Sequence, residues 1–198
     1  SKLLSQVNAD RNVLLNLINK DLFKNKIPKN ELNEFIIETP RKTFGGNILK
    51  LEYLKTFSSK FHQAIVNINE LIESKRGAGT CFVYSNLVKA GGIELFAEAL
   101  NSNGYFEYNE DMDYDLKDNS RDSKTGITLA EFKKKNKPLS EFNPSTYILV
   151  TGGLEEGDDI PEVKQRIIRN VFNSVENRHG KILKLVLGSK VMNEGVTL

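Results

Sequence analysis

Three short, almost wholly apolar runs alternate along the chain with segments whose apolar residues recur at helical spacing. The runs read TCFVYS, YILVT and ILKLVL and occupy residues 80–85, 147–151 and 182–187. Runs of this length without polar alternation are typical of strands that are buried on both faces of a sheet. Between them, helices are expected over 93–100 and over about 161–175. This strand–helix–strand order predicts an α/β fold, with a parallel sheet flanked by helices.

The beginning of the chain also carries helical periodicity. Apolar residues clustered between Leu14 and Phe23 predict a helix within residues 1–25, and Pro28 ends it. A short second helix is expected at 31–37. Thr39-Pro40 and Gly45-Gly46 then mark a loop.

One long amphipathic helix is expected next. Apolar residues beginning at Phe57 recur in steps of three and four, which predicts a helix over 58–74 with one face in the core. Phe57 and Phe61 are assigned to that core face and not to a base-stacking platform. The length of the chain allows one domain with an appendage or two small domains.

Residues 107–145 interrupt the alternation of strands and helices. Residues 107–122 hold seven acidic and two basic side chains, whereas residues 124–137 hold five basic and one acidic. This charge pattern predicts an inserted surface loop with a short helix at 129–135. Its run of lysines, Lys133 to Lys135 with Lys137, fits a solvated helix face better than a contact with nucleic acid.

Composition narrows the class of protein. The 198 residues carry a net charge of +2, so a basic coat over the whole surface is absent, although a local basic groove is allowed. The single cysteine, Cys81, excludes an intramolecular disulfide and a cysteine-based zinc cluster. No apolar stretch reaches the length of a membrane span, and we expect no membrane partner.

Small polar residues follow each of the three apolar runs. These strand ends are Ser85-Asn86, Thr151-Gly152-Gly153 and Gly188-Ser189-Lys190. Parallel strands bring their carboxyl ends to one edge of the sheet, which is where such folds bind ligands. Backbone amides beside glycine, together with hydroxyl groups, suit contacts with phosphate. The alternative is that these are ordinary turns that need small residues.

Three other features fit structural roles better than chemistry. The stretch GITLAEF at 126–132 resembles the end of a calcium-binding loop, but the matching alignment puts Lys124 at a ligand position and Thr125 at the required glycine. His179 lies in a turn between a helix and a strand. Cys81, inside an apolar run, fits a small core residue better than a reactive thiol.

The order of these segments is similar to a known family. FVYSN at 82–86, GGIELFAEAL at 91–100 and YILVTGG at 147–153 precede the most specific stretch, from FNS to EGVTL at 172–198. Together they resemble the second RecA-like domain of superfamily 2 helicases. The resemblance covers roughly residues 56–198. It implies one main domain at 51–198 behind a helical connector from a preceding domain at residues 1–50. The closest resemblance is to the helicase-like ATPases of large cytoplasmic DNA viruses, which include the small subunit of the poxvirus early transcription factor.

The resemblance implies roles for residues at the strand ends. FVYSN matches motif IV, which implies that Ser85 and Asn86 lie near a nucleic-acid backbone. Nucleic-acid contacts are implied in the same way for Thr151 with Gly152 and for Ser189 with Lys190. The last stretch resembles motif V, which implies that nucleotide binding involves three further residues, Glu194, Gly195 and Thr197.

Parts of the family's machinery have no counterpart in the sequence. The first RecA-like domain, with its Walker lysine and its Mg²⁺-binding acidic pair, and motif VI with its arginines are missing. We expect the chain to be a truncated domain that ends within motif V, because Val196-Thr197-Leu198 looks like the start of a strand. ATP and Mg²⁺ would act in the full-length protein, and we expect this chain alone to hold neither, to have no catalytic residue and to be inactive.

The resemblance predicts a part of an ATP-dependent helicase or translocase, whose preceding RecA-like domain holds ATP while this domain grips the nucleic-acid backbone. The alternative is a non-catalytic RecA-like scaffold that binds protein or nucleic acid, for example in a transcription factor. A stand-alone α/β protein for a small ligand is a third reading. The resemblance further implies viral transcription proteins as partners and a cytoplasmic location, in a virus factory or a virion.

Overall fold

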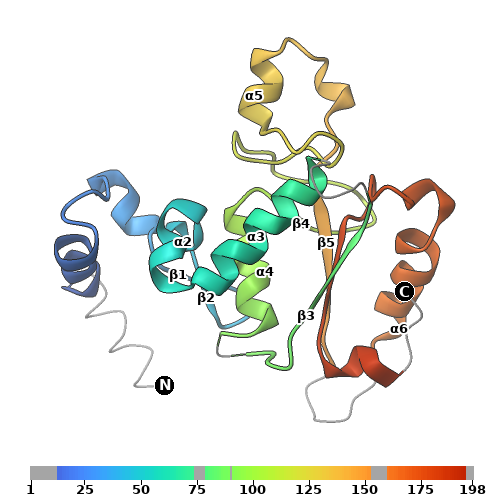
Figure 1. The fold of residues 1–198 in the computed structure, drawn as a ribbon, viewed down its shortest axis with the longest axis horizontal. Helices are drawn as coiled ribbons and strands as arrows, with labels where there is room; N and C mark the ends of the chain where they lie inside the picture. Colours follow the sequence, from blue (N-terminus) through green and yellow to red (C-terminus); the bar gives the residue numbers. More distant parts are fainter. Residues whose placement is uncertain (1–12, 74–78, 90, 153–159, 195–198) are drawn as a thin grey trace.

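A four-stranded parallel sheet forms the centre of the molecule (Figure 1). The computed structural model describes residues 13–73, 79–89, 91–152 and 160–194. The strand order is β3-β6-β5-β4. The parallel sheet is flanked by helices, as the sequence predicts, and is consistent with an α/β RecA-like fold. The strands are β3 Cys81–Tyr84, β4 Phe106–Glu107, β5 Thr146–Val150 and β6 Leu185–Gly188.

The register brings three strands to the same level at their carboxyl ends. Tyr84 of β3 pairs with Gly188 of β6, which in turn pairs with Val150 of β5. Strand β4, which the sequence analysis missed, is only two residues long and pairs with the first half of β5. It therefore stops short of that edge of the sheet.

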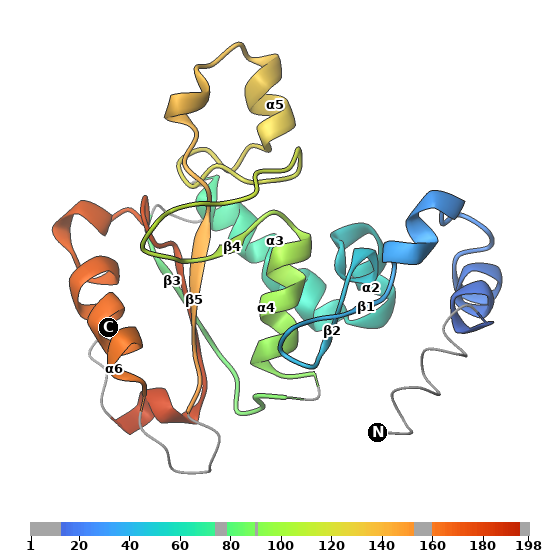
Figure 2. The same cartoon turned by 180° about the vertical axis from the view of Figure 1, so that it is seen from behind.

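Both faces of the sheet are covered, and alternate strand residues enter different cores. In β5, Tyr147 and Leu149 belong to a core with helices α3 (Ser59–Ile72) and α4 (Ile93–Ser102). Ile148 and Val150 belong to a second core. That core packs under α6 (Glu162–Ile167), which continues as the π-helical segment Ile168–Phe172. Figures 1 and 2 show α3 and α4 on one side of the sheet and α6 on the other.

Strand β3 lies at the outer edge of the sheet. Only β6 pairs with it among the described strands, so its burial alternates instead of being complete. Cys81 and Val83 pack towards α3 and α4, whereas Phe82 and Tyr84 are exposed on the other face. The expectation that this run is buried on both faces is therefore wrong for β3, while β5 and β6 confirm it.

The main helices confirm the periodicity. Ser58 caps α3, because its Oγ accepts a hydrogen bond from the Phe61 N–H at 3.2 Å. Helix α4 is almost wholly buried. In the helix after Pro161, however, Val163 is exposed. This helix ends at Phe172 and not at residue 175, so Val175 lies exposed in a separate 3-10 helix.

The segment before α3 is more varied than expected. Residues 13–22 are helical and end in the π-helical stretch Ile18–Leu22, as the sequence predicts. The expected loop contains an antiparallel hairpin of β1 (Ile37–Glu38) and β2 (Phe44–Gly45). Short 3-10 helices at Lys29–Glu34 and Asn47–Leu49, and helix α2 at Leu51–Phe57, complete the segment.

This first segment shares one core with the helices that cover the sheet. Leu15, Phe35 and Leu54 belong to the same buried cluster as Ile65 of α3 and Leu100 of α4. The expected domain boundary at residue 50 stays a prediction.

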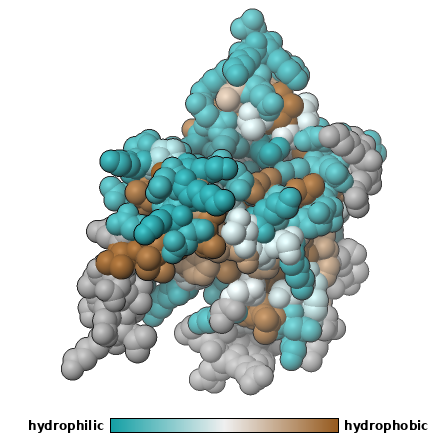
Figure 3. All heavy atoms as spheres, turned by 60° about the vertical axis from the view of Figure 1, so that its left-hand side comes forward, coloured by the Kyte–Doolittle hydropathy of each residue, from teal (hydrophilic) through white to brown (hydrophobic). Residues whose placement is uncertain are grey.

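The expected surface insert is a small lobe that projects from the sheet (Figure 1). It contains helix α5 (Leu129–Lys134) and a 3-10 helix at Leu139–Glu141. Leu129, Phe132 and Phe142 form a separate small core inside it. Figure 3 shows mostly hydrophilic side chains at the outer end of this lobe.

The last part of the described chain consists of short helices on either side of β6. Two 3-10 helices, Val175–Asn177 and Lys190–Glu194, lie before and after β6. Residues 195–198, where the sequence predicts a further strand, lie outside the described residues. Within the described part of the chain, no helix combines the length and the apolar character that crossing a membrane requires.

Candidate nucleic-acid interface

The predicted polar strand ends lie side by side at one edge of the sheet. The Ser85 N–H donates to the Gly188 carbonyl at 3.1 Å, and the Ser189 N–H donates to the Val150 carbonyl at 3.2 Å. Ser85, Ser189 and Thr151 therefore form a row across three neighbouring strands. We call this row, with Asn86, Gly152 and Lys190, the strand-end row. The sequence places these residues together correctly, and their contact with a ligand stays a prediction.

Two members of the strand-end row differ in how their side chains are engaged. The Ser85 hydroxyl is used within its own turn, since Oγ accepts from the Leu87 N–H at 3.1 Å and donates to the Leu87 carbonyl at 2.9 Å. Asn86 Oδ1 accepts from the Tyr84 hydroxyl at 2.7 Å. The Asn86 amide nitrogen has no hydrogen bond within the described residues and is free to donate to a ligand.

The remaining members of the strand-end row differ in how exposed they are. Thr151 and Gly152 are half-buried, Ser189 is buried, and Lys190 is exposed at the start of its 3-10 helix. A single exposed cation beside small polar residues suits an anionic ligand. Of the predicted nucleotide contacts, the side chain of Glu194 and all of Gly195 and Thr197 lie outside the described residues.

A pocket of about 650 Å³ opens beside this row. It lies between helices α2 and α3, the end of β3 and the start of α4. Ser85, Asn86 and Leu87 are part of its lining, as are Phe57 and Phe61. Nothing in the sequence indicated this pocket. The prediction that Phe57 belongs to the core is wrong, because Phe57 is 41% exposed.

The loop that closes the pocket depends on glycine. A Cβ atom on Gly92 would lie 2.1 Å from the Leu87 carbonyl oxygen, which no side chain tolerates. Its neighbour Gly91 has φ of +94°, in the region that favours glycine. The Gly91-Gly92 pair in the sequence was the available signal that the chain folds back closely at this point.

A network of charges lies away from this edge. Arg41 in the β1–β2 turn bridges Glu98 of α4, at 2.5 Å, and Glu107 of β4. Lys164 of α6 also pairs with Glu107, at 3.2 Å. Burial lowers the pKa of Arg41, but Tyr147 and the two carboxylates outweigh it, so that the net shift is upward. These contacts tie four elements together, which is a structural role.

Two buried tyrosines also serve the structure. The Tyr105 hydroxyl donates to Asn69 Oδ1 at 2.6 Å, and the Tyr147 hydroxyl donates to Asn101 Oδ1 at 2.9 Å. Burial raises the pKa of both phenols. Both therefore stay protonated and hold helices α3 and α4 against the sheet.

The calcium-like loop is held together by its own hydrogen bonds. Asp122 is buried and accepts from the backbone N–H groups of Lys124, Thr125 and Asn143. Glu131 forms a capping box with Thr128 at the start of α5. In the described residues no cluster of three or more metal-ligating side chains occurs. The structural reading of this loop accounts for its acidic residues.

Cys81 and His179 have structural surroundings. Burial raises the pKa of the half-buried Cys81 thiol, which disfavours the reactive thiolate. His179 lies exposed in its turn, where its Nε2 accepts from Arg178 Nε at 3.1 Å. Both observations agree with the roles expected from the sequence.

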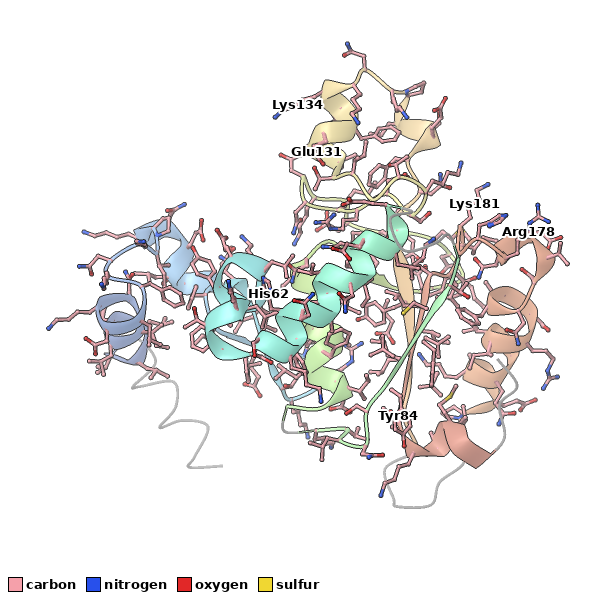
Figure 4. All side chains as sticks on the ribbon, viewed as in Figure 1. His62, Tyr84, Glu131, Lys134, Arg178 and Lys181 are labelled. Atoms are coloured by element: carbon pink, nitrogen blue, oxygen red, sulfur yellow. The ribbon has the colours of Figure 1, made fainter. Side chains whose placement is uncertain are left out.

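The lysines of the lobe face solvent. Lys133 pairs with Asp118 at 3.1 Å, and both side chains are exposed. The Lys137 ammonium lies 5.5 Å from the centre of the Phe132 ring. Figure 4 shows Lys134 in the lobe and Tyr84 towards the other end of β3, so the lobe lies far from the strand-end row.

Comparison with known proteins finds viral relatives. The chain is 43% identical, over 97% of its length, to a putative ATP-dependent RNA helicase of Acanthamoeba polyphaga mimivirus. It is 27% identical, over 75% of its length, to a second mimivirus protein of the same description. It is also 26% identical, over 81% of its length, to an early transcription factor large subunit homolog of African swine fever virus.

These relatives are much longer than the chain. The chain spans 18% and 19% of the two mimivirus proteins and 14% of the African swine fever virus protein. No protein-family model and no solved structure matches it. The similarities support a viral helicase-like family and, in general terms, a helicase-like function.

Proposed function

We propose that the chain is the second motor domain of an ATP-dependent nucleic-acid helicase or translocase. The observation that carries this proposal is the strand-end row, in which three parallel strands end in register and present small polar residues side by side. The names of the mimivirus relatives, which are putative ATP-dependent RNA helicases, support the same assignment.

The strand-end row would hold the sugar–phosphate backbone of one strand. The free amide of Asn86 and the ammonium of Lys190 would donate to phosphate oxygens. Thr151 and Ser189 carry hydroxyl groups, and Gly152 lets the backbone approach closely. Contacts of this kind read charge and shape and not base identity, so the grip would be independent of sequence.

ATP and Mg²⁺ belong to this proposal as ligands of the full-length protein. Glu194, Gly195 and Thr197 would face a nucleotide held by a preceding RecA-like domain. Binding and hydrolysis of ATP would supply the closing and opening of the two domains. This chain would contribute the moving grip on the strand, and we expect it to be inactive alone.

A second candidate is a non-catalytic scaffold in a viral transcription complex. The observation that favours it is the African swine fever virus relative, which is named as an early transcription factor large subunit homolog. In either case the partners would include viral transcription proteins, and the site of action would be the cytoplasm, in a virus factory or a virion.

Measurement of ATP hydrolysis separates the two candidates. A longer protein that contains this chain should hydrolyse ATP faster when single-stranded DNA or RNA is added, and the 198-residue chain should be inert. A longer protein that is inert with and without nucleic acid would support the scaffold. Hydrolysis by the chain alone would contradict both candidates.

The strand-end row is tested by one substitution and a matched control. Lys190→Met should weaken the binding of strands of every sequence by a similar factor and lower the salt slope of binding by about one. Lys134→Met removes an exposed lysine from the lobe, far from the row, and should leave binding unchanged. Equal losses in both variants would contradict the assignment of the row.

A further inference from the structure

Exposed apolar side chains gather around the pocket beside the strand-end row. Phe44 is 43% exposed, Phe57 41% and Leu87 64%, and the three come from the hairpin, helix α2 and the loop after β3. Side chains of this kind cost free energy when they face water. Their convergence on one cavity marks a binding site and not a scatter of surface residues.

The walls of this pocket are aromatic and firmly packed. Phe61 contacts the buried Phe96 edge to face, with ring centres 5.1 Å apart. The ring centres of Phe57 and Phe23 lie 5.8 Å apart, and Phe57 stays 41% exposed in the lining of the pocket. A volume of about 650 Å³ lies within the range of pockets that hold small planar ligands.

The charge of the lining distinguishes this pocket from its neighbours. Among the residues that the structure describes, Lys60 is the one charged residue that lines it, and no carboxylate does. The Lys60 ammonium has no ion pair within the described residues. By contrast, a pocket of about 630 Å³ near Arg41 is lined by Glu98, Glu107 and two aspartates. An apolar cavity with a cationic rim fits a flat ring that carries a phosphate.

The pocket adjoins the residues that would hold the nucleic-acid strand. Ser85 and Asn86 belong both to the strand-end row and to the lining of the pocket. A backbone held at the row would therefore pass the mouth of the pocket. A base on that backbone has only to turn away from its neighbours to enter.

We propose that this pocket receives one unstacked nucleobase of the bound single strand, which stacks against the exposed ring of Phe57. This inference rests on the proposed function, because it needs a strand on the strand-end row. Every base has a flat face, so stacking would add affinity without sequence preference. The site would explain why an aromatic ring is left exposed beside a row of polar residues.

The test compares a normal strand with an abasic one. Binding of a fluorescent oligothymidylate to the 198-residue chain is measured by anisotropy, beside a strand of equal length and charge that lacks bases, and both are repeated with ribose strands. One stacked base should make the normal strand bind about 5- to 150-fold more tightly. Phe57→Ala should bring the ratio of the two affinities close to one while leaving the abasic affinity unchanged.

Two further variants serve as a control and as a second test of the pocket. Phe82 is 42% exposed but lies on the other face of β3, so Phe82→Ala should keep the full ratio. Phe44→Ala removes a second wall of the pocket and should lower the ratio if Phe57→Ala does not fold. The wild-type ratio itself needs no substitution.

Each outcome is decisive. Measurable binding with equal affinity for normal and abasic strands would overturn the base pocket and leave the strand-end row intact. A high ratio that survives in a folded Phe57→Ala variant would place the stacking elsewhere and overturn the inference. If Phe57→Ala does not fold, a high ratio in Phe44→Ala would do the same. Binding to neither kind of strand would refute the proposed function, and the inference with it.

Discussion

Arg41 should hold the first part of the chain against the sheet, and its removal is the most direct test of the fold. This side chain reaches from the β1–β2 turn to Glu98 of α4 and Glu107 of β4. Because its pKa is raised, it stays charged at any pH at which the protein is handled. Arg41→Met keeps the length of the aliphatic stem and removes only the charge and its hydrogen bonds.

The expected cost follows from the burial of the two carboxylates. Glu98 is 7% exposed, and without Arg41 it keeps one hydrogen bond, from Asn101 Nδ2 at 3.1 Å. Removing one partner of a fully buried ion pair costs about 3–5 kcal/mol, and an exposed pair is worth about 1 kcal/mol or less. Glu107 is more exposed and keeps Lys164. We therefore expect Arg41→Met to lower the free energy of unfolding by about 2–3 kcal/mol.

Urea unfolding measures this loss, and a double-mutant cycle assigns it. Arg41→Met, Glu98→Gln and the double variant should give a coupling energy of about 1–2 kcal/mol, with the urea dependence unchanged. The melting temperature of Arg41→Met should fall by roughly 4–12 °C. Lys133→Met breaks an exposed pair with Asp118 and should cost under about 1 kcal/mol.

If the losses of unfolding free energy in Arg41→Met and Glu98→Gln simply add in the double variant, the expected coupling is refuted. Additive losses would mean that Arg41 and Glu98 do not stabilise each other, whatever their distance. A loss in Arg41→Met as small as that in Lys133→Met would show that the hairpin is not fastened to α4 by charge.

Three further predictions concern single groups. Burial lowers the pKa of Lys184 to about 8, against 10.5 when exposed, so the unfolded chain binds more protons between these values. The free energy of unfolding should therefore rise from pH 8 upward relative to that of Lys184→Met, and a constant difference between the two would contradict this. Asp122→Ala removes the acceptor of at least three backbone N–H groups and should cost about 3 kcal/mol, and limited proteolysis should cut the lobe first. Gly92→Ala should lower the melting temperature more than Gly91→Ala, because only the first places a Cβ against the Leu87 carbonyl; equal effects in thermal unfolding would refute this.

The sequence predicted the strand-end row well, for a physical reason. Parallel strands in one sheet have their carboxyl ends at one edge, so three apolar runs followed by small polar residues are enough to bring Ser85, Thr151 and Ser189 together. The pocket beside the row could not be predicted in this way. Phe57 and Phe61 have the same periodicity, and only the packing of α2 against α3 and the loop after β3 leaves one of them open.

What the sequence determined by itself were the elements whose signals are local. Helix α3 follows from its apolar spacing, and strands β5 and β6 follow from runs too apolar for any place but the centre of a sheet. The surface insert with helix α5 followed from its charges. Each of these signals acts within one segment and does not need a partner.

Only the tertiary structure decided which apolar segment lies at the centre of the sheet and which lies at its edge. The run at β3 is as apolar as the others but has one neighbouring strand among the described residues, so half of it faces outward. Strands β1, β2 and β4 are each two residues long. They form because another strand pairs with each of them. Pairing and burial of this kind depend on residues far apart in the chain, which local periodicity does not record.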